Sequence, residues 1–542
     1  MVDFDAVIIG SGAGGLAAAV ALAQSGQKVL VLEQHEVPGG WCHSFMLGGH
    51  RFSPGVHYLG ELGHGGRLRA IYQGLGVSGD LVFCELNPDG YDHAVIGGRR
   101  FDFCKGKAEL TRRLQESFPS ERKGIAGYLD TCQRISDELD ALMDIRGLGD
   151  VLRLPFKAPS VARWGLATAR SLIGKHAHDP LLRAIFAAQS GDHGLPPSIA
   201  PAAVHASITA HYFDGGWYPR GGGFALPRAF VRALKRAGGE LRLRTAVDRI
   251  LVENGRAIGV RLKGGSEIRA GAVISNADPH ATFGKLFDPA DVPARLRRKL
   301  QRTKYSVSAL SLFFAVDADL RKAGMDSGNL WWYANDDLDA IYRHGMTARL
   351  DDKIPGMFLT ATTLKDPSKG DGRTHTLEAF AFVPHESFQK WAGSRMNERP
   401  ADYLALKERL KARMLAAAGR ALPGIDGHVT FSDLGTPLTN TAYCMSTDGN
   451  LYGTEKSRWQ VGPWAWPVKG AYPGLLLCGA STLSHGVMGA TLSGLAAASA
   501  LLGVRVRELL TQRGPELVCV PSEHPEQWPA ELRRREPQQE AA

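Results

Sequence analysis

The sequence has little of what marks membrane-spanning, disulfide-rich or metal-binding proteins. Its 542 residues include only seven cysteines, and none of them stands in CxxC or CxxH spacing. This scatter argues against a zinc site and a disulfide framework, so we expect reduced thiols and no bound metal. No window reaches the roughly twenty uninterrupted apolar residues that a spanning helix needs. We therefore expect any membrane contact to be peripheral.

The composition also lacks extremes. Hydrophobic residues make up 44% of the chain and charged residues 22%, as in an ordinary globular protein. The start, MVDFDAVIIG, shows no secretory signal pattern, so we expect the protein on the cytoplasmic side. The net charge of +9 suits an anionic lipid surface, but no nucleic-acid motif accompanies it and we expect no nucleic-acid partner. The length predicts roughly two or three lobes.

The first forty residues predict a strand, a tight turn, a helix and a second strand. DAVIIG (5–10) precedes a glycine-rich turn, the alanine-rich LAAAVALAQSG and then KVLVLE. The turn contains GxGxxG, whose glycines permit a tight bend, a close backbone approach to a pyrophosphate and close packing of helix on strand. We therefore expect a βαβ unit that binds a dinucleotide through the turn residues Gly10, Ser11, Gly12, Ala13, Gly14 and Gly15.

The second strand ends at an acid, Glu33, about twenty residues after the glycines. A carboxylate there accepts hydrogen bonds from both ribose hydroxyls and disfavours a 2′-phosphate. We place Gln34 in the same site. The following Gly39 and Gly40 predict a turn that lets the backbone approach the cofactor.

An acid followed by a GG turn resembles the flavin-dependent amine oxidase and phytoene desaturase superfamily. The resemblance implies FAD rather than NAD, with Gly39, Gly40 and Trp41 continuing its site. It also implies that Val247, in the strand that enters an Asn254-Gly255 hairpin, lies against adenine.

A second segment near the other end resembles the superfamily's second flavin motif. YPGLLLCGASTLSHGVMGATLSG predicts a buried strand from Leu475 to Cys478, a glycine-rich loop and a helix that starts near Val487. The resemblance places Gly479 and Ala480 next to the ribityl-pyrophosphate. It brings a helix N-terminus, with Gly486, Val487 and Met488, towards the flavin pyrimidine edge. Because the superfamily often has Asp where Ala480 stands, one ribityl hydrogen bond is expected to be missing or supplied elsewhere.

The predicted fold class is α/β, with a Rossmann-like FAD-binding domain of the two-dinucleotide-binding-domain flavoprotein type and an α+β substrate domain inserted discontinuously. We assign residues 1–65, 204–288 and 430–511 to the FAD-binding domain and residues 66–203 and 289–429 to the substrate-binding domain. Residues 512–542, rich in Pro, Glu and Arg, are expected to be a flexible tail. No second dinucleotide fingerprint is found, so the electron donor or acceptor stays open.

Three further stretches resemble the retinol saturase and carotenoid isomerase branch: GGWCHSF (39–45), FSPGVHYLG (52–60) and TPLTNTAYCMSTDGNLYG (436–453). The resemblance implies saturation, desaturation or cis–trans isomerisation of carbon–carbon double bonds in a long apolar isoprenoid, carotenoid, retinoid or lipid. We expect an apolar tunnel beside the flavin, with His57, Tyr58 and Tyr212 as proton-donor candidates and His57 also near the cofactor. Ser53-Pro54 departs from the branch, which puts one contact near the flavin in doubt.

Two alternatives stay open at this point. One is a flavin amine or amino-acid oxidase of the same superfamily, and the other is a non-catalytic prenyl-lipid carrier that resembles GDP-dissociation inhibitors. Separately, residues 144–176 mix Arg and Lys with Leu, Phe, Val and Trp. This pattern suits a peripheral membrane surface, although a solvated helix pair explains it as well.

Overall fold

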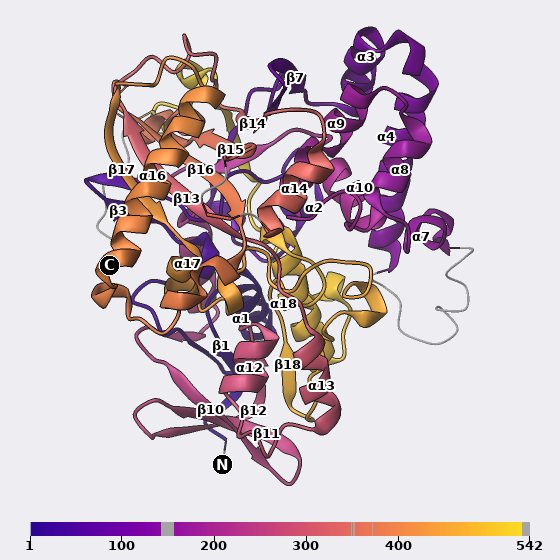
Figure 1. Ribbon diagram of the computed structural model, residues 1–542. Helices are drawn as coiled ribbons and strands as arrows, with labels where there is room; N and C mark the ends of the chain where they lie inside the picture. Colours follow the sequence, from indigo (N-terminus) through magenta and orange to yellow (C-terminus); the bar gives the residue numbers. More distant parts are fainter. Residues whose placement is uncertain (1, 143–156, 348, 351–352, 371, 534–542) are drawn as a thin grey trace.

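The structure is a computed structural model that describes residues 2–142, 157–347, 349–350, 353–370 and 372–533. Within these residues the strands form two seven-stranded sheets, one three-stranded sheet and a two-stranded hairpin. The two large sheets occupy opposite ends of the molecule, and helices α1 and α18 lie near its centre (Figure 1). The fold is therefore bipartite, as the chain length predicts.

The first sheet has a parallel core in the order β9-β2-β1-β12-β18, and β12 continues into an antiparallel meander with β11 and β10. The predicted βαβ unit is confirmed, because β1 and β2 pair in parallel. The strands are β1 (Phe4–Ile9), β2 (Val29–Leu32), β9 (Glu240–Arg242), β10 (Val247–Glu253), β11 (Arg256–Leu262), β12 (Glu267–Ser275) and β18 (Leu475–Leu477).

The Asn254-Gly255 hairpin is also confirmed. It joins β10 to β11, and both of its residues have positive φ, 49° and 72°. A two-residue turn of this kind matches the right-handed twist of the strands, and Asn-Gly adopts it with little strain. The hairpin fixes the register of the meander and so the position of Val247 at its start.

Helices cover both faces of the first sheet. On one face Ala6, Ile8, Val29 and Val31 share a core with α1, α11 and α18, and on the other Val7 and Leu30 pack with α12 and α13. This double cover explains why the strands are continuously apolar. The helices are α1 (Ala13–Gln24), α11 (Ala225–Arg236), α12 (Pro279–Lys285), α13 (Ala294–Arg302) and α18 (Gly486–Leu502).

The second sheet has the order β17-β13-β16-β15-β14-β6-β7 and is antiparallel except where β14 pairs with β6. Helix α16 (Ala401–Ala421) packs on the Leu312 and Phe314 side of β13. The strands are β6 (Asp92–Ile96), β7 (Arg99–Phe103), β13 (Ser308–Val316), β14 (Asn329–Tyr333), β15 (Gly356–Ala361), β16 (His375–Val383) and β17 (Val429–Gly435).

A helical layer packs on the aromatic side chains Trp331 and Phe358 of the second sheet. In it α8 buries Leu172 and Ile173 beside α4, so the apolar face of this part of the predicted membrane-surface stretch is already covered. Residues 144–156 of that stretch lie outside the described residues. The bounds of α4, α8 and the α-helices not yet listed are α2 (Arg67–Gly74), α3 (Lys107–Ser117), α4 (Arg122–Leu142), α7 (Pro159–Trp164), α8 (Ala169–His176), α9 (Pro180–Ala187), α10 (Ala202–His211), α14 (Leu338–Thr347), α15 (Thr362–Lys365) and α17 (Pro437–Cys444).

Three segments lie across the predicted domain boundaries. Helix α2 shares the first core with α1, although residue 66 was expected to begin the substrate domain. Helix α10 packs in the second core instead of the first. Strand β17 pairs with β13 of the second sheet, so the return to the first lobe comes after Gly435 and not at residue 430. The reason is common to all three: apolar residues at a boundary join whichever core lies beside them.

The expected flexible tail is wrong for residues 512–533. Strand β19 (Val518–Pro521) pairs in parallel with β5 (Val82–Glu85), which also pairs with β8 (Trp217–Pro219). Trp528 is only 1% exposed and donates from Nε1 to the carbonyl of Pro521 at 2.6 Å. The gain from pairing one strand and burying one indole therefore outweighs a composition that is typical of disorder.

A small hairpin, β3 (Phe45–Leu47) with β4 (His50–Phe52), forms its own two-stranded sheet. Phe52 is buried against Phe313 of β13, which links this early segment to the second sheet. Among the described residues, no helix combines the length and apolar character needed to cross a bilayer.

Trp528→Ala is expected to lower the free energy of unfolding by about 3–5 kcal/mol, because it empties a buried site and removes the hydrogen bond to Pro521. Thermal or denaturant unfolding measures the change. The matched control is Trp459→Ala, since Trp459 is 64% exposed. Equal small effects from both variants would show that the tail is loosely held.

Candidate functional site

A cavity of about 450 Å³ is lined by residues from both lobes. One part of its wall consists of the glycine turns that follow β1 and β18, and another consists of aromatic side chains from β14, β15 and β16. Both stretches that predict a dinucleotide site therefore open into the same space as the second sheet. The aromatic part includes Trp331, Tyr333, Phe358 and Phe380.

Glu33 is held in place by the first glycine turn. It follows β2 directly and is 7% exposed. Its Oε2 accepts hydrogen bonds from the Ser11 backbone N–H at 3.0 Å and from the Ser11 hydroxyl at 2.6 Å, and its Oε1 accepts from His35 N–H at 2.9 Å. Ser11 Oγ in turn accepts from Gly39 N–H at 3.1 Å. The carboxylate thus ties the first turn to the GG turn and is oriented before any ligand binds.

The glycines of the turn leave room that a side chain would fill. A Cβ on Gly14 would lie 2.9 Å from Gly479 N and 2.9 Å from Ala490 O, both backbone atoms. A Cβ on Gly12 would lie 2.6 Å from Asn276 Nδ2. The bare backbone also permits a ligand to approach the start of α1. These features suit the pyrophosphate of a dinucleotide.

The second motif brings another helix terminus to the cavity. Helix α18 begins at Gly486, as the sequence predicts within one residue, and both Gly486 and Val487 line the cavity. The residues that begin α1 line it too. Two helix N-termini, each with unpaired N–H groups and a positive dipole end, therefore face one space. This electrostatic arrangement suits a cofactor that carries phosphates and takes on negative charge when reduced.

Most of the predicted site residues are brought together here. The predicted residues that line the cavity are Gly10, Ser11, Gly12, Ala13, Gly14, Glu33, Gln34, Gly39, Gly40, Trp41, His57, Tyr58, Val247, Gly479, Ala480, Gly486 and Val487. They come from segments far apart in the chain. The fold therefore assembles one site from both termini, as the two motifs predict.

Three predicted residues do not line the cavity. Gly15 lies in the first turn of α1, where a Cβ would collide with the carbonyl of Gly10, so it serves helix–strand packing. Met488 packs against the first core. Tyr212 stacks behind Tyr58, with ring centroids 4.3 Å apart and an interplanar angle of 10°. Met488 misses the cavity because its position on α18 directs it to that core. Tyr212 misses it because the ring of Tyr58 stands in between.

Asn276 is a site residue that the sequence motifs do not reveal. It follows β12, donates from its backbone N–H to Ile9 O at 2.9 Å and lines the cavity. Its side chain lies between Gly14 of the first turn and Gly479 of the second. The one signal for it is a polar residue directly after a buried strand. Such a residue is expected at the carboxyl edge of a parallel sheet, where ligands bind.

His57 lies beside the buried side chain of Glu378. Its Nδ1 lies 3.1 Å from Glu378 Oε2, and its ring contacts Phe380 with centroids 4.7 Å apart. Glu378 is fully buried and also accepts from Ser53 N–H at 2.7 Å. Because this contact uses the backbone of residue 53, it does not depend on the side chain that departs from the branch pattern.

Lys365, at the end of α15, is fully buried behind His57. Its Nζ donates to His57 O and to Asn329 Oδ1, both at 2.5 Å. Burial lowers its pKa to about 7, and the nearby charges of Asp92 and Glu378 oppose that shift. A buried lysine of this kind holds the backbone of the cavity wall in place.

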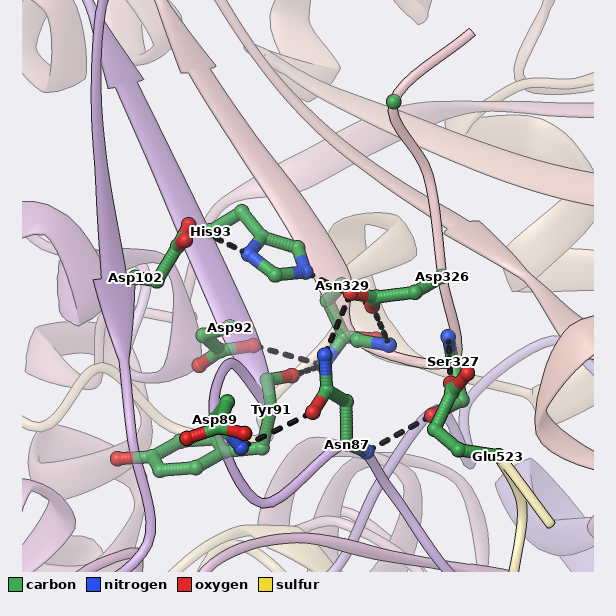
Figure 2. Close-up of polar contacts among 12 residues, drawn as sticks. Asn87, Asp89, Tyr91, Asp92, His93, Asp102, Asp326, Ser327, Asn329 and Glu523 are labelled. Carbon is green, nitrogen blue, oxygen red and sulfur yellow. Dashed lines mark hydrogen bonds and ion pairs between the residues drawn. The ribbon is translucent and has the colours of Figure 1, made fainter. Parts of the chain in front are cut away.

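Tyr58 reaches two carboxyl groups. Its hydroxyl lies 2.7 Å from Asp192 Oδ2 and 3.1 Å from Asp92 Oδ2. Asp92 also accepts from Asn329 Nδ2 at 2.7 Å and from Gln189 Nε2 at 2.8 Å. Figure 2 shows Asp92 and Asn329 on neighbouring strands of the second sheet. The sequence does not single out these acids, because no spacing links them.

A second polar cluster surrounds His93, the residue that follows Asp92 on β6 (Figure 2). His93 lies 2.7 Å from Asp102 and 2.8 Å from Asp326. Burial alone would lower the pKa of His93, but the two carboxylates raise it to about 9. Glu523 of the tail accepts from Ser327 N–H in the same cluster. In the part of the chain that the structure describes, no group of three or more His, Cys, Asp or Glu is placed to hold a metal ion.

Comparison with known proteins agrees with this geometry. The family model described as flavin-containing amine oxidoreductase matches residues 13–502. The chain is 32% identical to all-trans-retinol 13,14-reductase of Danio rerio over 84% of this chain and 78% of that protein. It is 26% identical to the chloroplastic prolycopene isomerase of Arabidopsis thaliana over 83% of this chain and 74% of that protein.

A solved oxidoreductase from Methanosarcina mazei has a similar fold, with a TM-score of 0.62 and 17% identity, and the match covers 91% of this chain and 99% of that one. The predicted fold class, a Rossmann-like FAD-binding domain with a substrate domain, is confirmed. The glycine turns, Glu33 and the two helix N-termini fit the cofactor of this family, and the chain belongs to the flavin-containing amine oxidoreductases as an FAD-dependent oxidoreductase.

Proposed function

We propose that this protein reduces or isomerises carbon–carbon double bonds in a long apolar polyene of the retinoid or carotenoid kind. The observation that carries the proposal is the cavity, which joins a dinucleotide site to an aromatic wall. The names of the relatives, a retinol 13,14-reductase and a prolycopene isomerase, point to the same substrate chemistry. The residue roles that follow are part of the proposal.

Bound FAD would supply the exchange of a hydride. Glu33 would accept hydrogen bonds from the ribose hydroxyls, and Val247 would lie against adenine. The start of α1 would bind the pyrophosphate, and Gly479 and Ala480 would lie along the ribityl chain. Lys456 donates from Nζ to Ala480 O at 2.6 Å, which holds this loop in position without an aspartate at residue 480.

The aromatic wall suits a substrate without polar groups along its chain. Trp331 and Phe358 make an edge contact with centroids 4.6 Å apart, and Phe380 packs 6.2 Å from Phe358. An isolated alkene offers no oxygen to polarise, so orientation and exclusion of water are what such a wall can contribute. Such rings would hold an extended polyene through van der Waals contacts alone, which would leave it free to slide in and out.

A peripheral contact with a lipid surface is a second part of the proposal. Trp459 and Trp464 are 64% and 44% exposed, with ring centroids 5.7 Å apart, and Leu166 is 55% exposed. Arg458 donates to Leu166 O at 3.1 Å, which places these loops side by side. Exposed tryptophans beside arginine suit an anionic membrane interface, where an apolar substrate would be found.

Glu33→Gln is expected to weaken FAD binding about tenfold or more, since a hydrogen bond to a charged group contributes about 1.5–3 kcal/mol. Titration of the apoprotein with FAD, followed by flavin fluorescence, measures the dissociation constant. Glu36→Gln is the matched control, because Glu36 is exposed beside Arg244. Equal affinity in both variants would rule out the ribose role of Glu33.

Purified protein reconstituted with FAD is expected to convert a retinoid or carotenoid under anaerobic conditions with dithionite as reductant. The physical reason is that an apolar chain bound along the aromatic wall would lie beside the proposed flavin site. Mass spectrometry with chromatography detects either a gain of two hydrogens or an isomer at constant mass. Peroxide formed from amines, with no change in any polyene, would instead support an amine oxidase.

Trp459→Ala with Trp464→Ala is expected to reduce co-sedimentation with phosphatidylserine-containing vesicles several-fold, because two interfacial indoles are lost. Leu404→Ala is the control, since Leu404 is 50% exposed on α16. Binding that is equally weak before and after the change would contradict the membrane proposal and leave the chemistry untouched.

A further inference from the structure

Tyr58, Asp92 and Asp192 form a close group of three acidic side chains. The Tyr58 hydroxyl lies within hydrogen-bond distance of both carboxyl groups, at 2.7 Å from Asp192 and 3.1 Å from Asp92. A phenol carries a single hydrogen and can donate to only one of them. If both acids were ionised, one carboxylate would face the phenol oxygen without a hydrogen between them. Both contacts become hydrogen bonds when one carboxyl group is protonated.

The surroundings of Asp92 favour its ionised form. Besides Tyr58, it accepts from the side-chain amides of Gln189 and Asn329, and Asn329 in turn accepts from the buried Lys365. Burial raises the pKa of Asp92, while these hydrogen bonds and the charge of Lys365 oppose the shift. Donors on both oxygens leave little reason for this carboxylate to hold a proton of its own.

Asp192 has the opposite surroundings. It lines the cavity together with Tyr58, and Tyr58 is the side chain that hydrogen-bonds its carboxyl group. Burial and the negative charge of Asp92 raise its pKa well above the usual range, against the smaller effect of the Tyr58 hydrogen bond. The additional proton therefore belongs on Asp192, which can donate to the Tyr58 oxygen while Tyr58 donates to Asp92.

The backbone around Asp192 is fixed. Its carbonyl lies 2.8 Å from Nε2 of His485, the residue that precedes α18, and the Gly191 carbonyl accepts from Tyr452 at 2.8 Å. The residue thus connects the second sheet's helical layer to the loop that carries the second flavin motif. A carboxyl group at this place adjoins both the aromatic wall and the proposed flavin edge.

We propose that Asp192 is the acid of the reaction and that the protein is a reductase of the double bond. This proposal rests on the proposed function and deepens it. In the step, the π bond breaks, one carbon receives a hydride and its two electrons from reduced flavin, and the other carbon receives the proton of Asp192. Two C–H bonds form, the flavin is oxidised, and Asp192 is left as a carboxylate that solvent protonates again. Isomerisation, in contrast, requires no net proton.

This assignment gives the predicted proton-donor candidates different tasks. Tyr58 is a positioning residue, because its single hydrogen is directed to Asp92 while it accepts from Asp192. Tyr212 stacks behind it and keeps the ring in place. His57 stays paired with Glu378, at 3.1 Å. Asp192 lies about 130 residues further along the chain than Tyr58, so no local motif could have linked the two.

The first measurement is infrared spectroscopy of the FAD-loaded protein at neutral pH without substrate. A protonated carboxyl group absorbs at a higher wavenumber than a carboxylate, and most other acids are ionised at this pH. We expect the band of a neutral carboxyl group in the wild type and in Asp214→Asn, whose exposed side chain makes it the matched control. The band is expected to disappear in Asp192→Asn. Its loss in Asp92→Asn together with its persistence in Asp192→Asn would overturn the assignment.

The second measurement is single-turnover reduction of the polyene by the dithionite-reduced enzyme. Asp192→Asn is expected to slow the gain of two hydrogens by about 10²- to 10⁴-fold, the usual contribution of a general acid, while polyene binding changes little. Asp214→Asn is expected to match the wild type. Equal rates in Asp192→Asn and the wild type, or an isomerised product in both, would overturn the proposal.

The two proposals fail in different ways. A neutral carboxyl band that depends on Asp192, without conversion of any polyene, would overturn the proposed substrate but support the protonated acid. Conversion that survives Asp192→Asn would support the substrate and overturn the acid. If Asp192→Asn does not fold, Asp92→Asn replaces it: loss of the negative charge is expected to shift titration of the neutral band to lower pH. A band that does not shift would contradict the assignment.

Discussion

The structure depends on a backbone contact between α1 and α18, the helices that follow the two flavin motifs. A Cβ on Gly494 would collide with the Gly14 carbonyl, and a Cβ on Gly14 would lie 2.9 Å from Ala490 O. Only glycine permits this approach, because any larger side chain would push the helices apart. The contact brings both helix N-termini to one cavity. The chain between them leaves the first sheet, forms the second lobe and returns at β18.

The second lobe places buried charge beside an apolar wall, and this combination has a physical cost that has to be offset locally. Glu378, Lys365 and Asp92 are all fully buried. Each takes part in at least one hydrogen bond, and the charges of Asp92 and Glu378 act on Lys365, which offsets part of the loss of hydration. These residues hold the segment that carries His57 and Tyr58 against the second sheet. This wall of the cavity is therefore held in position by the protein's own buried groups.

The parts of the fold that the sequence predicts are those with short-range signals. GxGxxG with Glu33, the Asn254-Gly255 turn and the helix near Val487 all depend on residues close in the chain, and each is found where it was expected. Asn276, Asp192 and Lys365 belong to no recognisable motif, and only tertiary packing brings them to the site. The tail shows the same limit, because its composition indicates disorder while one buried tryptophan, Trp528, orders it.

The two lobes contribute different features to the cavity: the first carries the glycine turns suited to the cofactor, and the second carries the aromatic wall suited to a substrate. The glycine turns and helix termini suit phosphate and ribose, groups that every FAD presents, so they carry no information about the reaction. What distinguishes one substrate from another lies on the opposite wall, where aromatic rings stand beside Tyr58 and Asp192. On such a wall burial and a neighbouring like charge both raise the pKa of a carboxyl group, as they do for Asp192 beside Asp92. In the proposed reduction, Asp192 would in this way present an acid to an alkene, a substrate that offers no hydrogen-bonding group of its own.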